Sequence, residues 1–598
     1  MRKILFILLA VVLLTACSEG IFVDNTVKSP DGRIAVCLTD SGLNVSRDGN
    51  PVQFIRINVG KHDSFNCAFD NPVYFEYEMV SGKRKKISGT FNSIVVWVSD
   101  KSLIELRVQN DGLAYRFYQT KGDRMEVTYV IPDGQRRWAQ TLKTDYEGFY
   151  PMQTESRRGK YGYPMLTQYG DNLFGLITES DVSGYMSATH LAVQESGEYR
   201  VEYMSDPVND GDLILTPFNI LILGSLADVV ESTLVTDVIG RCSIEDTSWI
   251  EPGLSSWIYW ANNHGSKDFK KVKEYIDLAA EMKWPYTLID WEWDEMSNGG
   301  DINDALAYAR SKGVKVNLWY NSGTSWIGPG APGPQDRLVT ADAREKEMTR
   351  LEQMGVTGIK VDFFLPDSAG MIQYYTDILK DAARHHLLVD FHGCTVPRGW
   401  NCAWPNLMSM ESVYGAEWYN NNPRMTNAAP AHNATLPFTR NVIGPMDYTP
   451  CTFSDSQHKH ITTDCHELAL PILFESGLQH MADRPESYRA LPKTVKQLLM
   501  ELAAAWDDTR LLYGYPGESA VIARRSGDRW FIAGINGTAE PMEVKPDFDR
   551  LDYDGIVTLF TDKGSEPGKG FDIKTGIGIP QTLTIPARGG FVMVTQSN

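Results

Sequence analysis

The chain has 598 residues, and its 42% of hydrophobic and 22% of charged residues are the composition of a folded globular protein rather than a disordered one. This length corresponds to about two to four domains, among which one large barrel is allowed. The 76 acidic residues outnumber the 57 basic ones and give a formal net charge of −19. Such a surface repels phosphate backbones, so nucleic acid is not an expected partner.

The N-terminus has the form of a bacterial export signal that ends in a lipid-attachment site. A short basic start precedes an apolar run, Ile4 to Leu14, that is too short to span a membrane. Leu14-Thr15-Ala16-Cys17 then resembles a lipobox. We predict that residues 1–20 are a lipoprotein signal peptide and tether, with acyl chains on Cys17 as the only membrane contact. The mature protein would be periplasmic or anchored to the outer membrane. An ordinary signal peptide with an incidental cysteine is the alternative.

Residues 21–250 are predicted to form short strands. Ile55–Val59 and Leu103–Val108 alternate apolar and polar residues, and Ser93–Val98 is a β-branched run. Turn sequences such as Pro132-Asp133-Gly134 separate such segments. We therefore expect a large antiparallel N-terminal β-super-sandwich.

Between residues 251 and 513, strand-like and helix-like segments alternate. The predicted strands are Trp257–Trp260, Tyr286–Trp291, Val314–Trp319, Gly358–Phe363 and Leu387–His392, and the predicted helices are 267–283, 302–311, 341–354 and 372–385. This alternation predicts a parallel sheet, and further strand candidates near Asn406, Asn441 and Gly477 complete a (β/α)8 TIM barrel. An open doubly wound sheet is the alternative, but no glycine-rich phosphate loop follows a strand.

From residue 514 to residue 598 the pattern returns to strands. Ala520–Ala523, Trp530–Gly534 and Gly590–Val594 are examples. A small C-terminal β-sandwich is the simplest interpretation. The predicted fold class is therefore a TIM barrel flanked by an N-terminal and a C-terminal β-domain.

Acidic residues stand at the predicted ends of the barrel strands, where catalytic groups lie in such barrels. Asp290, Asp362 and Asp390 each occupy such a place, and an Asp in an apolar strand is costly to bury without a partner or a function. Glu411 and Glu417 follow the next strand. Neighbouring carboxylates need a proton or a cation between them, and Ca²⁺ prefers clustered oxygen ligands.

Paired carboxylates in an aromatic-lined barrel mouth are the minimum equipment for glycoside hydrolysis. One acts as nucleophile or base, and the other as an acid with a raised pKa. The 15 Trp and 27 Tyr residues are consistent with either core filling in β-rich domains or stacking on sugar rings.

Several motifs together resemble glycoside hydrolase family 97. They are Gly358–Phe364, Asp390–Gly393 with Pro397–Gly399, Glu411–Trp418 and Gly444–Pro450. The resemblance covers nearly the whole chain, including the lipoprotein-type leader. It implies a calcium-dependent, exo-acting glycosidase whose substrate is an oligosaccharide or a polysaccharide side chain.

The family has an inverting α-glucosidase branch and a retaining α-galactosidase branch. The two base glutamates of the inverting branch correspond to Asn321 and Gly393, so both are missing here. The aspartate nucleophile of the retaining branch corresponds to Asp362, and the acid/base of both branches to Glu417. The resemblance therefore implies a retaining α-galactosidase.

The resemblance also implies the Ca²⁺ ligands Glu411, Glu417 and Glu179, the last in a Thr-Glu motif of the N-terminal domain. With these, we predict a set of substrate-binding residues in and around the barrel mouth: Asp290, Trp291, Trp319, Asn321, His392 and Asp447.

Alternatives remain within and outside this enzyme class. An α-glucosidase and a β-L-arabinopyranosidase stay open, because β-L-arabinopyranose has the ring configuration of α-D-galactose without its exocyclic CH₂OH. A non-catalytic carbohydrate-binding lipoprotein would not need both Asp362 and Glu417. A zinc site at His458, His460, Cys465 and His466 is disfavoured, because this stretch is predicted to be an amphipathic helix. The spacing of the cysteines assigns no disulfide, and no oligomeric state is predicted.

Overall fold

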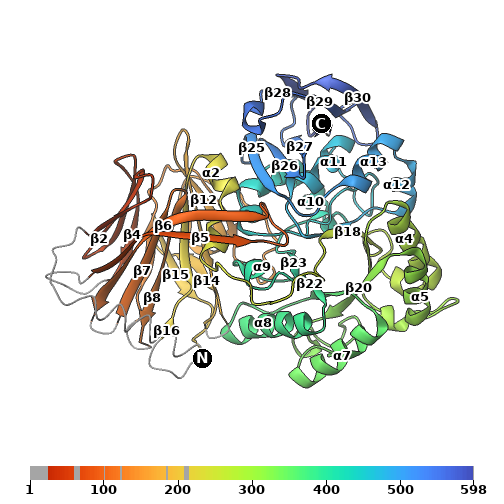
Figure 1. Cartoon of the computed structure of the whole chain (residues 1–598), viewed down its shortest axis with the longest axis horizontal. Coiled ribbons are helices and arrows are strands. Elements are labelled where there is room, and N and C mark those ends of the chain that lie inside the picture. The colour runs from red at the N-terminus through yellow and green to blue at the C-terminus, as the bar shows by residue number, and fades with distance from the viewer. Residues whose placement is uncertain are drawn as a thin grey trace.

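The computed structural model describes residues 25–58, 67–99, 102–120, 124–183, 186–207 and 214–596. The predicted signal peptide and Cys17 lie outside these ranges. The described residues form three parts that pack side by side, an N-terminal β-structure, a central barrel and a C-terminal β-structure (Figure 1). Together with the family comparisons given below, this arrangement confirms the predicted fold class.

The N-terminal part is built of antiparallel strands with buried inner faces. In β2, for example, every second residue is buried, as the alternating sequence predicts. The strands are β1 (Thr26–Lys28), β2 (Ile34–Thr39), β3 (Gly42–Arg47), β4 (Asn50–Ile57), β5 (Cys67–Glu78), β6 (Lys86–Ser99), β7 (Ser102–Gln109), β8 (Gly112–Gln119), β9 (Val127–Val130), β10 (Arg137–Thr141), β11 (Met152–Gln153), β12 (Gly159–Gly170), β13 (Leu173–Ser180), β14 (Thr189–Val193), β15 (Glu198–Tyr203), β16 (Ile214–Leu215) and β17 (Phe218–Gly224). Two short helices, α2 (Leu226–Glu231) and α3 (Leu234–Asp237), lead towards the barrel.

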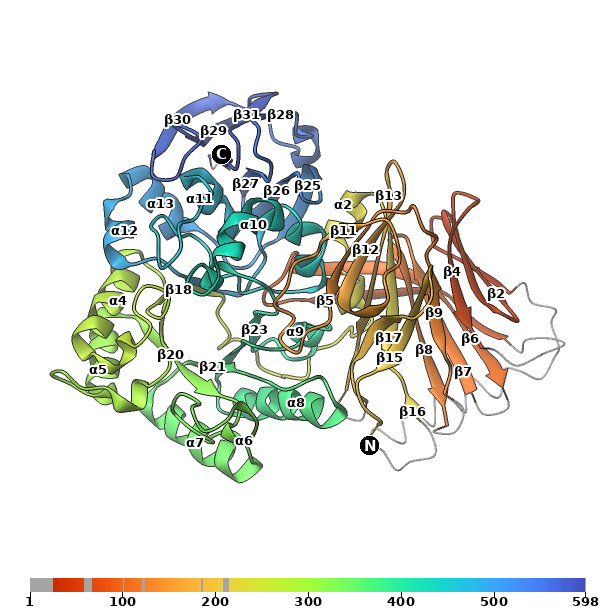
Figure 2. The same cartoon turned by 180° about the vertical axis from the view of Figure 1, so that it is seen from behind.

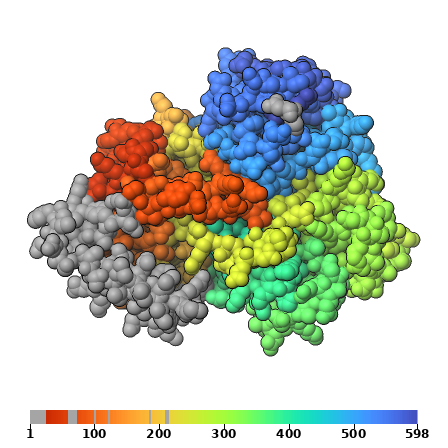
Figure 3. Space-filling view, viewed as in Figure 1, coloured from red at the N-terminus to blue at the C-terminus, as the bar shows by residue number. Residues whose placement is uncertain are grey.

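A long hairpin formed by β5 and β6 fastens the N-terminal part to the other two. Its tip reaches the junction of all three parts (Figures 1 and 2), and in the space-filling view it touches both the C-terminal part in blue and the yellow segment that leads into the barrel (Figure 3). At the tip, the ammonium group of Lys83 donates to the carbonyl oxygens of Ser232 and Val442 at 2.9 and 2.7 Å. Burial lowers the pKa of Lys83 to about 7. This docking holds the N-terminal loops against the barrel.

The central part is a sheet of seven parallel strands in the order β23-β22-β21-β20-β19-β18-β24 among the described residues. Nearly all of their side chains are buried, as expected for parallel strands covered on both faces. The strands are β18 (Gly253–Trp257), β19 (Tyr286–Ile289), β20 (Lys315–Asn321), β21 (Gly358–Asp362), β22 (Leu388–Phe391), β23 (Leu407–Met410) and β24 (Leu478–Met481). The first strand begins and ends earlier than predicted, so Ile258–Trp260 lie in the loop after it.

Helices cover the outside of this sheet, and local sequence defines their ends. Helix α7 (Ala341–Met354) begins after Thr340, whose side chain accepts from the backbone N–H of Ala343, and ends at Gly355 in a left-handed conformation. The other helices are α4 (Phe269–Glu281), α5 (Ile302–Lys312), α6 (Thr324–Ile327), α8 (Ala369–Arg384), α9 (Trp400–Ala403), α10 (Pro423–Asn433), α11 (Asp464–Leu473), α12 (Pro485–Ala490) and α13 (Lys493–Glu501). Short 3-10 helices are η1 (Gly265–Lys267), η2 (Trp293–Glu295), η3 (Ala416–Tyr419), η4 (Leu436–Phe438) and η5 (Arg440–Ile443).

The gap between β23 and β24 is where the barrel departs from the prediction. Asn441 was expected in a strand but lies in η5. The segment after it bridges the gap instead, because the N–H of Met446 donates to Glu475 at 2.9 Å and that of Asp447 donates to Met410 at 3.1 Å. The barrel is therefore nearly closed, with seven strands and one hydrogen-bonded segment in the eighth place.

The C-terminal part is a six-stranded antiparallel sheet in the order β25-β26-β27-β32-β29-β30, with a two-stranded sheet of β28 and β31. Its elements are β25 (Asp508–Tyr515), β26 (Ser519–Ser526), β27 (Arg529–Asn536), β28 (Met542–Val544), η6 (Phe548–Leu551), β29 (Ile556–Asp562), β30 (Phe571–Gly578), β31 (Leu583–Ile585) and β32 (Gly590–Thr595). Helix α11 of the barrel packs against β27 and β32. Within the ranges that the structure describes, no helix combines the length and the apolar character needed to cross a bilayer.

Candidate active site

The carboxyl ends of the barrel strands carry the acidic residues that the sequence analysis singled out. Asp362 is the last residue of β21, and Glu411 follows β23 directly. Glu417 lies in η3, within the loop after β23. His392 follows β22 and lies beside both glutamates. Groups that follow barrel strands meet at one end of the barrel, so this end is the candidate active site.

The carboxylate of Asp362 is held in one orientation by two donors. The N–H of Phe363 donates to Oδ1 at 2.8 Å, and the indole N–H of Trp319 donates to Oδ2 at 3.2 Å. Burial raises the pKa of Asp362 to about 7, although the positive charge of Lys360 acts in the opposite direction. Trp319, predicted to contact substrate, is only 1% exposed, and this hydrogen bond occupies its indole N–H.

Asn321 and Gly393 stand where the inverting branch has its two base glutamates, and neither brings a carboxylate near Asp362. A methyl group placed on Gly393 would come within 2.9 Å of Asp362 Oδ1, and the backbone there has a φ of 47°. Asn321, predicted to bind substrate, instead turns its side-chain amide to the loop after β20. Its Nδ2 donates to the carbonyl oxygens of Pro332 at 2.6 Å and Pro334 at 3.1 Å.

His392 connects two groups of acidic side chains. Its Nδ1 lies 3.2 Å from Glu411 Oε2 and 3.6 Å from Glu417 Oε2, while its Nε2 lies 2.8 Å from Asp447 Oδ2. Burial alone would lower the pKa of His392, but the charge of Glu411 and other carboxylates raises it well above its ordinary value. His392, predicted to bind substrate, is 1% exposed and lies against these acidic side chains.

Behind His392 lies a fully buried group of Asp390, Asp447 and His480. Asp447 Oδ2 lies 2.6 Å from His480 Nδ1 in addition to its contact with His392. Burial would raise the pKa of Asp447, but His480 and His392 hold it well below its ordinary range. Asp447, predicted to contact substrate, is therefore engaged with two histidines.

Asp290 was also predicted to bind substrate, but its carboxylate is occupied inside the barrel. Its Oδ2 accepts from the indole N–H of Trp257 at 2.7 Å and lies 3.4 Å from Lys360 Nζ. Its Oδ1 accepts from the N–H of Trp291 at 2.9 Å. The side chain of Lys360 is 3% exposed, and this residue was not among the predicted site residues. The available signal was a lysine two residues before Asp362, on the same face of β21.

Glu147 brings a carboxylate of the N-terminal part beside Trp418 at this end of the barrel. It lies in the loop between β10 and β11, and the indole N–H of Trp418 donates to its Oε2. Burial, Glu411, Asp145 and Glu417 together raise the pKa of Glu147 well above its ordinary value. Glu147 was not among the predicted site residues, because a glutamate in a loop carries no periodic signal.

Glu179, predicted as a metal ligand, has different partners. Its Oε1 accepts from the guanidinium of Arg398 at 2.6 Å, and its Oε2 accepts from the hydroxyl of Thr189 at 2.5 Å. It belongs to neither of the groups of described residues that could hold a metal ion. Arg398 compensates the charge of Glu179, whereas the charges of Glu411 and Glu417 act on Glu147.

The donors at the active end fit a metal ion. Glu411 Oε2 accepts from the N–H of Gly393 at 2.9 Å, whereas the buried Oε2 of Glu417 has no hydrogen-bond partner. His392, Glu411 and Glu417 form one of the groups that could hold an ion, and the charges of Glu411 and Glu417 also act on the buried Glu147. Clustered carboxylate oxygens are the donors that hard divalent cations prefer.

The four residues of the zinc alternative do not form a site among the described residues. Helix α11 begins only at Asp464, so the first two histidines lie before it, contrary to the predicted helix. His460 Nδ1 lies 2.9 Å from Asp455, and His466 Nε2 lies 3.0 Å from the amide nitrogen of Asn433.

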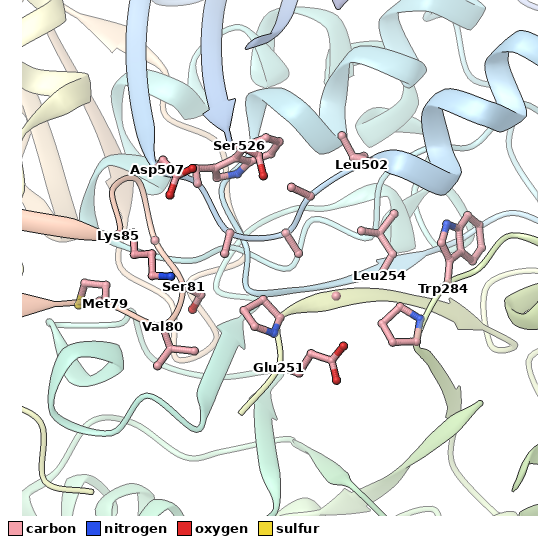
Figure 4. Close-up of a pocket in the computed structure, with 18 of the residues that line it drawn as sticks. Met79, Val80, Ser81, Lys85, Glu251, Leu254, Trp284, Leu502, Asp507 and Ser526 are labelled. Atoms are coloured by element: carbon pink, nitrogen blue, oxygen red, sulfur yellow. The ribbon is translucent and has the colours of Figure 1, made fainter. Parts of the chain in front are cut away.

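Two cavities of similar size lie at opposite ends of the barrel. One, of about 520 Å³, lies at the N-terminal ends of β18 and β19, where the tip of the β5–β6 hairpin meets residues 500–507. Figure 4 shows Ser81 and Lys85 of the hairpin, with Glu251 below them and Trp284 on the far side. This end is remote from Asp362. The other cavity, of about 540 Å³, lies at the active end and is lined by Trp291.

Comparisons with known protein families agree along the chain. Models described as Glycosyl-hydrolase 97 N-terminal, Glycoside hydrolase 97, and Glycosyl-hydrolase 97 C-terminal, oligomerisation, match residues 27–239, 249–413 and 505–596. A further model, described as a prokaryotic membrane lipoprotein lipid attachment site, matches residues 1–18.

Individual relatives span much of the chain. A protein of Streptomyces bingchenggensis named "Probable retaining alpha-galactosidase" is 38% identical over 461 residues, which are 73% of this chain and 69% of that protein. The "Retaining alpha-galactosidase" of Bacteroides thetaiotaomicron is 26% identical over 96% of both chains. A crystal structure of a β-arabinopyranosidase superposes with a TM-score of 0.83 at 26% identity, covering 96% of this chain and all of that one.

Proposed function

The chain belongs to glycoside hydrolase family 97, and we propose that it is an exo-acting, retaining α-galactosidase that forms a covalent ester on Asp362. One observation carries the retaining assignment. Asp362 ends β21 with its carboxylate against Gly393, and Asn321 directs its amide into a loop. Gly393 and Asn321 offer no carboxylate that could activate water. The carboxylate that remains for attack on the sugar is therefore that of Asp362.

In the first step, a carboxylate oxygen of Asp362 attacks the anomeric carbon from the face opposite the leaving group. Glu417 transfers its proton to the glycosidic oxygen as the bond from that oxygen to the anomeric carbon breaks. The bonding electron pair goes to the leaving oxygen, and a glycosyl ester forms on Asp362.

In the second step, Glu417 acts as a base. Its carboxylate takes a proton from water as the water oxygen attacks the anomeric carbon. The ester bond breaks, and its electron pair returns to Asp362. Two inversions give net retention of configuration.

The surrounding residues support the attack by holding Asp362 and favouring its charged form. Trp319 and the N–H of Phe363 bind its two oxygens, and the positive charge of Lys360 lowers its pKa. These donors are in place before substrate arrives, so the nucleophile needs little reorganisation during the reaction.

We further propose that Glu147, Glu411 and Glu417 hold a Ca²⁺ ion. Glu411 and Glu417 lie in one group of possible metal ligands, their charges act on the buried Glu147, and Glu417 Oε2 lacks a hydrogen-bond partner. The donors that these three residues offer are carboxylate oxygens. When bound, Ca²⁺ would balance these charges and polarise sugar hydroxyls.

A β-L-arabinopyranosidase is the second candidate function. The support is the superposition on a β-arabinopyranosidase over 96% of this chain, at the same identity as the Bacteroides α-galactosidase. β-L-Arabinopyranose and α-D-galactose share a ring configuration, so the mechanism above applies to glycosides of both sugars.

The lipid-attachment match at residues 1–18 supports an exported lipoprotein. We propose that acyl chains on Cys17 tether the enzyme in the periplasm or at the outer membrane, and that its substrate is an oligosaccharide or a polysaccharide side chain.

The test compares nitrophenyl α-galactoside, α-glucoside and β-L-arabinopyranoside side by side, with and without a chelator. Proton NMR of the first-formed sugar then gives the stereochemistry. We expect preference for the galactoside, retained configuration and dependence on Ca²⁺. Preference for the arabinopyranoside would select the second candidate, and an inverted first product would overturn the mechanism.

A further inference from the structure

The cavity of about 540 Å³ at the active end is formed by three consecutive loops of the barrel. His264 comes from the loop after β18, Trp291 and Glu292 come from the loop after β19, and residues 330–335 come from the loop after β20. Its volume is in the range of about 300–1,000 Å³ that is typical of small-molecule sites. We call it the Trp291 cavity.

Trp291 joins this cavity to both catalytic residues. Its ring packs edge-on against Trp319, with centroids 6.1 Å apart, and Trp319 donates to Asp362. On another side it packs edge-on against Tyr259, with centroids 4.9 Å apart. The residue after Tyr259, Trp260, donates its indole N–H at 2.9 Å to the carbonyl oxygen of Ala416, which directly precedes Glu417. The Trp291 cavity therefore adjoins the catalytic centre.

Two flat rings line the Trp291 cavity. The imidazole of His264 lies nearly parallel to the indole of Trp291, at 19° and with centroids 6.0 Å apart, and its side chain is 66% exposed. The indole N–H of Trp291 donates to the carbonyl oxygen of Asn263 at 2.7 Å, and His264 Nδ1 lies 2.7 Å from Glu292 Oε2. Flat rings held in this way match the C–H face of a pyranose.

The carboxylates of the lining are compensated by cations. Lys267 Nζ lies 3.1 Å from Glu292 and 2.9 Å from Glu295, and Arg337 lies 3.3 Å from Asp294. A charged ligand would have to displace one of these pairs. The chemistry favours a neutral ligand whose hydroxyl groups bind the remaining carboxylate and amide oxygens.

The loop after β20, which also lines the Trp291 cavity, is held in place by Asn321. This residue occupies the place where the inverting branch has a base, and its amide binds the carbonyl oxygens of Pro332 and Pro334. The N–H of Glu292 donates to Gly333 at 2.8 Å and ties the same loop to its neighbour. A wall fixed before binding loses little conformational entropy when a ligand arrives.

We propose that the Trp291 cavity binds the sugar on the leaving-group side of the scissile bond, so that the substrate is an α-linked oligosaccharide rather than a galactoside with a small non-sugar aglycone. This inference rests on the proposed function and adds to it the partner of the released galactose. A neutral pyranose lies against His264 and Trp291, on the side where Glu417 protonates the leaving oxygen.

The experiment compares two donors that differ only in the leaving group. α-Galactosyl fluoride needs no leaving-group sugar, whereas an α-galactosyl-(1→6)-glucose disaccharide does. In His264→Asn, the ratio of kcat/KM for the disaccharide to kcat/KM for the fluoride is expected to fall about tenfold, because one ring of the platform is gone.

His386→Asn is the matched control. His386 also stacks on a tryptophan, Trp249, at 27° and 5.0 Å, but it lies two residues before the start of β22, at the other end of the barrel. Asparagine tolerates its positive φ of 53°. This variant should leave the ratio at the wild-type value.

A second measurement separates failure of the inference from failure of the proposed function. Saturation-transfer NMR with glucose on the full-length enzyme reports sugar binding without turnover, and its signal should weaken in His264→Asn only. If wild type cleaves α-galactosides but neither the ratio nor this signal changes in His264→Asn, the inference is wrong and the function stands. If wild type cleaves no α-galactoside, the function fails, and the glucose signal alone decides whether the cavity binds sugar.

Discussion

Lys360 Nζ lies 3.4 Å from Asp290 Oδ2 in the interior of the barrel, and both side chains are at most 3% exposed. The same lysine lowers the pKa of Asp362, two residues further along β21. A buried cation thus serves a structural pair and the candidate nucleophile together. Both effects depend on the charge of Lys360. Measuring stability and pH dependence in the same variants distinguishes the effect on Asp290 from the effect on Asp362.

Lys360→Met should destabilise the protein by about 3–5 kcal/mol, because it leaves the buried charge of Asp290 uncompensated. It should also raise the pH at which kcat/KM falls on the acid side, since Asp362 must be ionised to attack. Urea unfolding and a pH profile measure the two effects. The double variant Lys360→Met/Asp290→Asn should recover part of the stability but not the pH profile. An unchanged unfolding free energy in the single variant would contradict the ion pair.

Gly393→Ala should lower kcat/KM by about 100-fold, because the added methyl group would displace Asp362, and small misplacements of reacting groups have effects of this size. Gly355→Ala is the control. Gly355 also has a positive φ, of 75°, but its nearest neighbour is Arg310 at 3.8 Å. Both variants should lose stability through backbone strain, and only Gly393→Ala should lose activity beyond that. Equal activity of the two variants would count against the close contact of Gly393 with Asp362.

Glu147→Gln should weaken Ca²⁺ binding by about tenfold or more, because a ligand charge is lost. Glu179→Gln should leave Ca²⁺ affinity unchanged and lower the melting temperature, because Arg398 loses the partner at 2.6 Å. Calorimetric titration of the metal-depleted enzyme gives the affinities. If Ca²⁺ binding is weakened in Glu179→Gln but unchanged in Glu147→Gln, the metal ligand from the N-terminal part is Glu179, as expected from the sequence.

Removal of Ca²⁺ should shift the acid limb of the pH profile upwards. The pKa of Asp362 lies at about 7 with Glu411 and Glu417 both raising it, and a bound cation would offset these two charges. The metal-free enzyme should therefore lose activity as the pH falls through about 7. In the Ca²⁺-loaded enzyme the cation should keep Asp362 ionised to lower pH. Profiles of α-galactosyl fluoride hydrolysis in chelator and after Ca²⁺ is restored make the comparison. Identical profiles would speak against a cation beside these carboxylates.

The sequence predicted the barrel and the place of Asp362 for the same physical reason. Parallel strands buried on both faces leave apolar runs that alternate with amphipathic helices, and a carboxylate at the end of such a run, as at Asp362 in β21, stands out. Glu417 could be placed in the following loop because Gly415 permits a turn there. These are local sequence patterns, and they can be interpreted without knowledge of the tertiary structure.

Other features depend on how distant segments dock, which no local pattern records. Glu147 enters the site only because an N-terminal loop packs on the barrel, where Lys143 donates to the hydroxyl of Tyr414 at 2.7 Å. Asp290 and Asp447 stand near strand ends as predicted, yet Lys360 and two histidines occupy their carboxylates. A carboxylate at a strand end is therefore a candidate site residue. Its neighbours in the folded protein determine whether its oxygens are available to bind substrate.

The last prediction concerns the covalent intermediate. Asp362→Gly should lose several orders of magnitude in turnover of α-galactosyl fluoride, and azide should restore part of it, because the small anion can occupy the vacated space and attack from the side of the lost carboxylate. The product should be the β-galactosyl azide, of inverted configuration. Glu417→Gly is the matched variant: its glycosyl ester still forms, so azide attacks from the opposite face and should give the α-galactosyl azide. Two azides of opposite configuration would assign nucleophile and acid/base separately. Wild-type product of inverted configuration, or the same azide from both variants, would show that Asp362 is not the nucleophile.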